Sequence, residues 1–294
     1  MARRLRIAGA LAGLVVASVA AQEPVRPISG DACPANEGCA VASGRYRIVL
    51  PPRAKAERLG AIMYFHGYQG SAAETLADAG LVAVARRLGV ALIAPDGAGR
   101  SWSFPGSPAR YRDEFSFVGQ VLDDAVTRFG LDPARILASG FSQGGSMVWY
   151  LACRMPSRFA AFAPIAGAFW EPLPDGCVGE RPPLIHFHGT SDATIPLAGR
   201  ALRQGYRQGD LFRSLAILAP GGCTAALLEA ARTSAAAQRL SCEVAPGCSA
   251  PARLELCLHG GGHVADAAWV ERAWRLMVPA GPSPFAAGSK LTSP

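Results

Sequence analysis

Ser142 is the residue of this sequence whose type and neighbours best suit nucleophilic chemistry. It stands in Gly140-Phe141-Ser142-Gln143-Gly144, between an apolar run at 135–139 and an apolar stretch at 143–154. The first predicts a strand and the second a helix, so the serine occupies a sharp turn where bulkier neighbours would clash. There the Gln143 N–H, at the helix N-terminus, can stabilise an oxyanion. The alternative is a plain structural turn, since the chain has 33 glycines.

A carboxylate that follows the nucleophile in the chain suits the role of the acid. A serine hydroxyl needs a base, and the base needs a carboxylate to orient it. Asp192 ends the segment 188–192 (HGTSD), directly after a predicted strand at 183–187. We therefore expect it to be the acid, against the alternative of a turn carboxylate bonded to its own backbone. Asp96 precedes Ser142 and does not fit the order serine, acid, histidine.

Two of the five histidines follow the predicted acid. His263 comes after three glycines, in a loop from which its ring can turn towards Ser142. His259 ends the preceding strand and is the second choice. We expect His263 to be the base and interpret His186 and His188, which precede the acid, as satisfied core histidines.

The loop after the predicted strand 61–65 should supply the second oxyanion donor. Tyr68 is placed for this, because His66-Gly67 lets the backbone approach closely. His66 is interpreted as ordering the loop. Trp102 and Trp170, in neighbouring loops, are candidates to line an acyl or aromatic pocket, and packing is an equally good explanation for both.

Strands and helices alternate along the chain. Further strands are expected at 45–50, 90–94, 159–165, 236–243 and 252–258. Helices are expected at 71–88, 113–129 and 264–278, with residues 197–232 mostly helical. This alternation predicts an α/β protein with a mostly parallel central sheet flanked by helices on both faces, as in the α/β-hydrolase fold.

The first residues predict an exported protein. Three arginines precede an apolar stretch at 7–20, which ends in small residues, as in a secretory signal peptide cleaved after Ala21 or, as the alternative, after Ala20. We therefore divide the chain into a signal peptide (1–21), an N-terminal loop segment (22–44), a catalytic domain (45–278) and a disordered tail (279–294). About 14 apolar residues are too few to span a membrane. A formal net charge of +7 without Lys/Arg runs does not argue for nucleic acid.

Eight cysteines in an exported chain predict disulfide bridges. They form no paired Cys-x-x-Cys sets, so a zinc site is not expected. The spacing of the cysteines favours two of the pairs, and a predicted turn near residues 246–247 favours a third pair across a hairpin. The two cysteines that remain then pair with each other. The expected bridges are Cys33–Cys39, Cys153–Cys177, Cys242–Cys257 and Cys223–Cys248.

Several segments, in order over about residues 45–278, carry a family resemblance. They are 64–67 (YFHG), 95–97 (PDG), 131–136 (LDPARI), 140–147 (GFSQGGSM), 151–153 (LAC), 159–167 (FAAFAPIAG), 188–192 (HGTSD) and 261–263 (GGH). The chain in these segments resembles the secreted esterases grouped with polyhydroxybutyrate depolymerases, which include feruloyl and acetylxylan esterases. The resemblance implies a triad of Ser142, Asp192 and His263, and a Cys153–Cys177 bridge. Relatives commonly have Trp-Pro-Gly after the histidine; this chain has residues 264–266 (VAD), so the rim of the site differs.

The expected function is that of an exported serine carboxylic-ester hydrolase that works through an acyl-enzyme on a small or oligomeric ester. No metal or organic cofactor is expected. A serine peptidase of the same fold and a non-catalytic binding protein on that fold are the alternatives.

Overall fold

A computed structural model of the chain describes residues 33–34, 37–52, 58–180, 182–219, 227, 239–245 and 253–280. The expected signal peptide, most of the segment 22–44, all but two residues of the tail and both cysteines of the Cys223–Cys248 pair lie outside these residues. No helix within the described ranges is long and apolar enough to cross a membrane.

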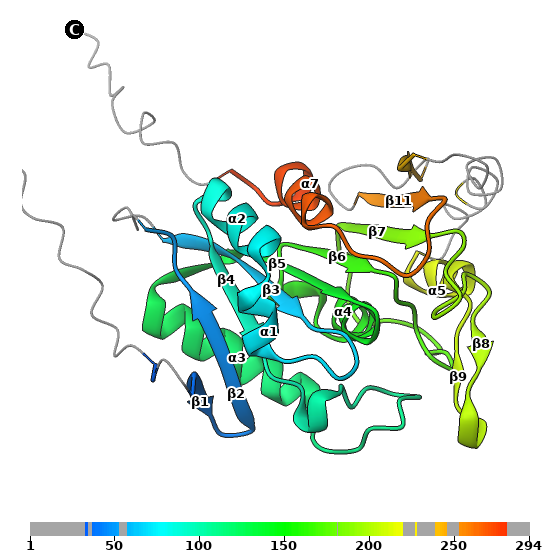
Figure 1. Cartoon of the computed structure of the whole chain (residues 1–294), viewed down its shortest axis with the longest axis horizontal. Helices are drawn as coiled ribbons and strands as arrows, with labels where there is room; N and C mark the ends of the chain where they lie inside the picture. Colours follow the sequence, from blue (N-terminus) through cyan, green and yellow to red (C-terminus); the bar gives the residue numbers. More distant parts are fainter. Residues whose placement is uncertain are drawn as a thin grey trace, which may run out of the picture.

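A sheet of nine described strands forms the centre of the molecule (Figure 1). Its spatial order is β1-β2-β4-β3-β5-β6-β7-β11-β10, and the six strands from β4 to β11 run parallel. The outer strands β2 and β10 pair antiparallel with their neighbours. The strands are β1 (Cys39–Val41), β2 (Gly44–Val49), β3 (Leu59–Phe65), β4 (Ala91–Pro95), β5 (Leu131–Phe141), β6 (Ala161–Ile165), β7 (Leu184–Gly189), β10 (Ser241–Val244) and β11 (Leu254–His259).

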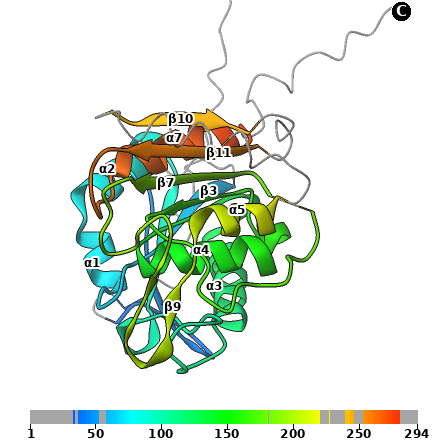
Figure 2. The same cartoon turned by 90° about the vertical axis from the view of Figure 1, so that its right-hand side faces the viewer.

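Helices cover both faces of the sheet, which explains why its inner strands are apolar throughout. Every residue of β3, β4, β6, β7 and β11 is buried. One hydrophobic core lies under α3, α4 and α5, and a second lies under α2 and α7 on the other face (Figure 2). The helices are α1 (Ala72–Ala77), α2 (Ala79–Leu88), α3 (Glu114–Phe129), α4 (Gln143–Arg154), α5 (Leu211–Leu218) and α7 (Ala267–Met277). The prediction of an α/β-hydrolase fold is confirmed.

Three predicted elements differ from the structure. The helix expected at 71–88 is two helices, because Asp78 has an extended backbone and its side chain caps α2 through the Leu81 amide. The segment 22–44, expected to be a loop, includes strand β1. Residues 200–208 form a small hairpin of β8 (Arg200–Ala201) and β9 (Arg207–Gln208), where a helix was expected. Gly199 precedes β8 and Gly205 lies in the turn before β9, with φ of +68° and +79°. These backbone angles interrupt a helix.

Three of the expected disulfide bridges are present. Cys33–Cys39 ties the N-terminal residues to β1, and Cys153–Cys177 joins the end of α4 to the loop after β6. Cys242–Cys257 links directly paired residues of β10 and β11, as expected for a hairpin. The first bridge therefore ties residue 33 to β1, and the third ties the edge strand β10 to β11.

Candidate active site

Ser142 lies in a strained turn between β5 and α4. Its φ of 59° and ψ of −121° are unfavourable for a residue with a side chain. A Cβ on Gly140 would lie 2.8 Å from the Phe65 carbonyl oxygen, and one on Gly144 would overlap that same oxygen. The glycines on either side of the serine are therefore required by the close approach of β3.

A continuous chain of hydrogen bonds joins the three predicted catalytic residues. The Nε2 atom of His263 lies 2.8 Å from Ser142 Oγ, and its Nδ1 atom lies 2.7 Å from Asp192 Oδ2. Ser142 and His263 are 121 residues apart in sequence, so only the fold brings them together. In this arrangement the ring can accept the serine proton at Nε2 while Nδ1–H donates to the carboxylate.

Asp192 is held from both of its oxygens. Its Oδ1 accepts hydrogen bonds of 2.8 Å from the amides of Thr194 and Ile195. Burial raises the pKa of this carboxyl, but hydrogen bonds from His188, from His263 and from the Ile195 amide outweigh burial and hold the pKa well below its usual range. The carboxylate is therefore ionised at neutral pH.

The loops that hold the acid and the base are fastened to each other. The Thr190 amide donates to the His259 carbonyl at 2.8 Å, and the Ser191 amide donates to the Gly261 carbonyl at 3.1 Å. A Cβ on Gly189 would overlap the carbonyl oxygens of Gly261 and Gly262. Glycine at 189 therefore lets the two loops meet, which fixes the separation of Asp192 and His263.

The two expected oxyanion donors border the serine. Gln143 begins α4 next to Ser142, and its side-chain Nε2 donates to Ser101 Oγ at 2.9 Å. Gly67, the neighbour of Tyr68, lies against Ser142: a Cβ built on it is 3.5 Å from the serine Cβ. No hydrogen bond to another described backbone group engages the Tyr68 amide, and the Tyr68 side chain is 65% exposed. The Gln143 amide is thus next to Ser142, and the Tyr68 amide, one residue from Gly67, stays a predicted second donor.

His66 braces the loop that holds Tyr68. Its Nδ1 atom lies 2.8 Å from the Gly67 carbonyl oxygen, and its Nε2 atom accepts from the Gly97 amide at 3.0 Å. This pattern requires the neutral ring with hydrogen on Nδ1. Burial lowers the pKa of His66, which favours the same neutral form. The structure agrees with the interpretation that His66 orders the loop.

Both tryptophans proposed as pocket residues pack in the hydrophobic core. Trp102 is 0% exposed and its Nε1 donates to the His66 carbonyl at 2.8 Å. Trp170 is 6% exposed and its Nε1 donates to Ser146 Oγ at 3.2 Å. The proposed pocket role is therefore wrong for Trp102, which has no surface to offer, and packing explains Trp170 as well.

The remaining candidates have structural partners. Asp96 Oδ1 accepts from the Ala72 amide at 2.7 Å at the start of α1. His259 accepts at Nδ1 from the Gly261 amide at 3.1 Å and packs on Trp269, so it supports the loop that holds His263.

The sequence reasoning missed one part of the site. His186 and His188 are buried in the core, as expected, although His186 Nδ1 makes no well-formed hydrogen bond among the described residues. They also lie behind the predicted acid, because His188 Nε2 is 3.5 Å from Asp192 Oδ2. The signal was their spacing, because residues i and i+2 of a strand share one face.

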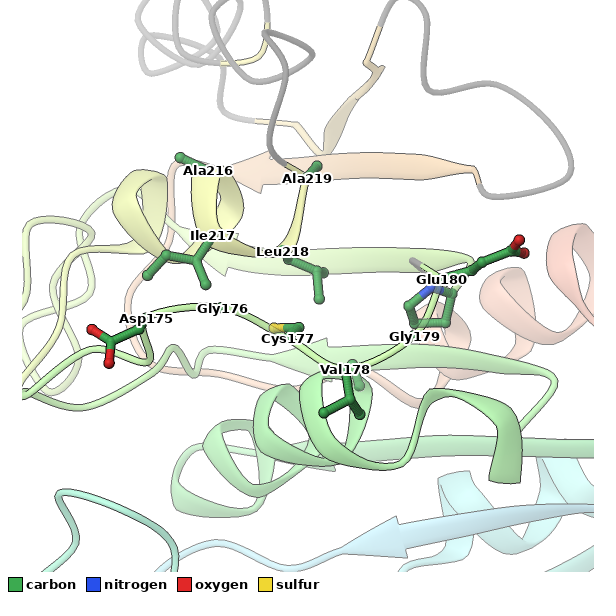
Figure 3. Close-up of a pocket in the computed structure, with 12 residues that line it drawn as sticks. Asp175, Gly176, Cys177, Val178, Gly179, Glu180, Ala216, Ile217, Leu218 and Ala219 are labelled. Atoms are coloured by element: carbon green, nitrogen blue, oxygen red, sulfur yellow. The ribbon is translucent and has the colours of Figure 1, made fainter.

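A cavity of about 640 Å³ lies away from this constellation, between α5 and the loop around Cys177 (Figure 3). None of Ser142, Asp192 and His263 lines it. The cavity therefore gives no argument about the chemistry at Ser142.

The family model and the relatives that match this chain all describe esterases. Residues 44–172 match the family described as Esterase PHB depolymerase. The putative esterase NocK of Nocardia uniformis subsp. tsuyamanensis is 33% identical over 187 residues, covering 59% of this chain and 53% of that protein. Feruloyl esterase B of Piromyces equi is 27% identical over 218 residues, covering 69% of this chain and 39% of that protein. The chain thus spans about half or less of the length of these relatives.

A solved structure agrees with the fold. The S-formylglutathione hydrolase of Staphylococcus aureus aligns with a TM-score of 0.50 at 14% identity, covering 80% of this chain and 92% of that one. Residues 44–172, the segment that contains the Ser142 turn, are similar to the esterase family of the PHB depolymerases.

Proposed function

We propose that this protein is a serine carboxylic-ester hydrolase that works through an acyl-enzyme. The observation that carries the proposal is the hydrogen-bonded chain from Ser142 through His263 to Asp192, with the serine on a strained turn between strand and helix. This geometry supports the chemistry more directly than the motif does, because three residues from distant loops meet within hydrogen-bond distance.

In the first half of the reaction, Ser142 Oγ attacks the ester carbonyl carbon while its proton passes to His263 Nε2. The negative charge moves to the carbonyl oxygen, where the Tyr68 and Gln143 amides stabilise it. Asp192 stabilises the imidazolium that forms. The tetrahedral intermediate collapses, the C–O bond breaks, and the alcohol leaves with the proton from His263.

In the second half, water repeats these steps on the acyl-enzyme. His263 Nε2 takes a proton from the water as its oxygen attacks the acyl carbon, and then returns it to Ser142 Oγ. The carboxylic acid is released, and the enzyme regains its starting form. None of these steps calls for a metal or an organic cofactor.

The substrate that we propose is a hydroxyalkanoate, feruloyl or acetylxylan ester. It is supported by the match to the PHB depolymerase family and by similarity to a feruloyl esterase. Export from the cytoplasm is part of the same proposal, and it is supported by the bridges Cys33–Cys39, Cys153–Cys177 and Cys242–Cys257, which persist in oxidising compartments.

Labelling with a fluorophosphonate tests the function. Wild-type protein should be labelled once per chain and Ser142→Ala should not be labelled. A panel of a hydroxybutyrate trimer, methyl ferulate, acetylated xylan and p-nitrophenyl esters then identifies the acyl group. A folded wild-type protein that takes no label and hydrolyses no ester would show that the fold serves binding instead.

A further inference from the structure

A second row of polar side chains continues the site into the core behind Asp192. His186 and His188 lie on the same face of β7 and are 0% and 1% exposed. The Nε2 atom of His186 lies 2.8 Å from His188 Nδ1, and His188 Nε2 lies 2.7 Å from the Ile195 carbonyl oxygen. Two adjoining histidines are costly in such a place unless each ring is hydrogen-bonded.

The partners of the two rings determine where their hydrogens lie. A carbonyl oxygen only accepts, so His188 Nε2 must carry a hydrogen that points at Ile195. In the neutral ring, His188 Nδ1 is then an acceptor, and His186 Nε2 must donate to it. Burial, and next the neighbouring His188, hold the pKa of His186 well below its usual range, so this ring is neutral. A backbone contact with Pro164 acts on this pKa in the opposite direction, and Nδ1 makes no well-formed hydrogen bond among the described residues.

The His188 N–H also faces the carboxylate of Asp192. Its Nε2 atom is 3.5 Å from Oδ2, the same oxygen that accepts from His263 at 2.7 Å. The other oxygen, Oδ1, is occupied by two backbone amides. His188 is therefore the one described side chain besides His263 within ion-pair distance of Asp192, and it approaches from the core.

We propose that His188 is a positioning residue of the ester hydrolase: its Nε2–H, held in one tautomer by His186, orients the Asp192 carboxylate towards His263. The inference rests on the proposed function. His188 does not touch the substrate or the reacting atoms. It acts through Asp192, and His186 acts through His188.

The carboxylate needs such support because its orientation sets the position of the base. Rotation about the Cβ–Cγ bond moves both oxygens, so it would break the two amide bonds to Oδ1 and also move Oδ2 away from His263. An N–H on the core side of Oδ2 limits this rotation. The same N–H donates to Ile195, whose amide binds Oδ1, so one residue links both contacts.

Two polar replacements at residue 188 separate this role from packing. In His188→Gln the amide nitrogen extends to about the position of Nε2 and can donate to Ile195 and Asp192. In His188→Asn the shorter amide reaches only the position of Nδ1 and meets His186. Both fill less space than histidine and keep a polar group in the core, so each is the packing control for the other.

We expect kcat to fall about 10- to 100-fold in His188→Asn, the range that a hydrogen bond to a charged group supports, with KM changed by less than about twofold. His188→Gln should recover most of that loss. In an Asp192→Asn background, His188→Asn should change the rate of fluorophosphonate labelling by less than about twofold, because the group on which His188 acts has lost its charge.

Several results would overturn the proposal. They are equal kcat values in the two variants, a fall that appears in KM alone, or the same loss from His188→Asn with and without Asp192. Circular dichroism and melting temperature verify that each variant is folded. Should His188→Asn not fold, His186→Leu replaces it: removal of the tautomer lock should lower kcat, and wild-type kcat in that variant would also overturn the proposal.

The two proposals fail in different ways. Wild-type protein that neither takes label nor hydrolyses esters would refute the proposed function and this inference with it. Active wild-type protein with no difference between the Gln and Asn variants would refute the role of His188 alone.

Discussion

His66 Nε2 accepts a hydrogen bond of 3.0 Å from the Gly97 amide, and this bond fastens the loop after β3 to the loop after β4. The same ring contacts the Gly67 carbonyl oxygen, one residue before Tyr68. The position of the Tyr68 amide therefore depends on a histidine that touches neither the substrate nor the triad.

We predict that His66→Ala lowers kcat on a small ester about 10- to 100-fold, because the Tyr68 N–H is no longer held where the oxyanion develops. Tyr68→Ala is the matched control. It keeps the backbone amide and removes an exposed ring, so its kcat should stay within about threefold of wild type. A larger loss in Tyr68→Ala than in His66→Ala would contradict the assignment of the donor to the backbone.

The assignment of the base is tested by comparing His263 with His259, the last residue of β11. Ser142→Ala and His263→Ala should each lower kcat by roughly 10⁴- to 10⁶-fold, because nucleophile and base act as a unit. His259→Ala should cost about tenfold or less, since His259 only supports the loop through the Gly261 amide. Steady-state kinetics on a p-nitrophenyl ester measures all three. Loss of turnover in folded His259→Ala, with His263→Ala active, would reverse the assignment of the base.

Acid should destabilise the fold from about pH 6.5 downwards. Burial lowers the pKa values of His66, His186 and His259. Near pH 6.5 the unfolded chain therefore binds protons at these histidines and the folded chain does not. As the pH falls from the unfolded pKa of each ring to its folded pKa, the free energy of unfolding decreases. The slope is at most about 1.4 kcal/mol per pH unit for each histidine. Urea unfolding at pH 7.5 and 5.5 measures it.

A control for this prediction is His66→Gln, whose stability should depend less steeply on pH than that of wild type. Asp192 affects stability at lower pH than the histidines do. Its depressed pKa stabilises the fold above about pH 4, and this stabilisation is lost only on further acidification. Equal stability of the wild-type protein at pH 7.5 and 5.5 would show that these rings are not buried in solution.

Gly189 should be intolerant of a side chain. Gly189→Ala places a methyl group against the Gly261 and Gly262 carbonyls, and we expect a loss of about 1–3 kcal/mol in unfolding free energy together with lower kcat. Gly176→Ala is the matched control, because a Cβ there meets no atom within 4 Å. Thermal unfolding and kinetics should separate the two variants clearly.

The Cys242–Cys257 bridge should stabilise the edge of the sheet. It closes a sequence separation of 15 residues, so Cys242→Ser with Cys257→Ser should cost about 3 kcal/mol. Denaturant unfolding measures the loss. Thiol titration of denatured, unreduced protein should find no free cysteine in the wild type, and two or more reactive thiols per chain would contradict the expected four bridges.

The meeting of Ser142, Asp192 and His263 could be predicted from sequence because each residue has a local signature. Ser142 has glycines that the turn requires, Asp192 follows an apolar strand, and His263 follows three glycines. The order serine, acid, histidine along the chain then indicated the role of each residue. The elements of the sheet could be predicted for a similar reason, since strands buried on both faces are short apolar runs.

What could not be predicted depends on contacts between distant segments or on single backbone angles. The hairpin at 200–208 was wrongly predicted to be helical, because its backbone turns at two glycines within a stretch of otherwise helix-compatible residues. The surroundings of Trp102 are set by the loop after β3, which no local pattern reveals. The approach of His188 to Asp192 requires that the chain fold back within the four residues after His188, and the sequence does not specify that turn.

The segment from Val264 to Asp266 is held at both ends by atoms that do not belong to it. His263 is fixed at its start by the serine and the acid, and Asp266 Oδ1 accepts from the Ala268 amide at its end, at the first turn of α7. Val264 between them is 48% exposed. Val264 and Ala265, which lie between these fixed points, can therefore be exchanged without breaking either contact. Such an exchange changes the surface beside His263 and leaves the hydrogen-bonded chain to Ser142 and Asp192 in place.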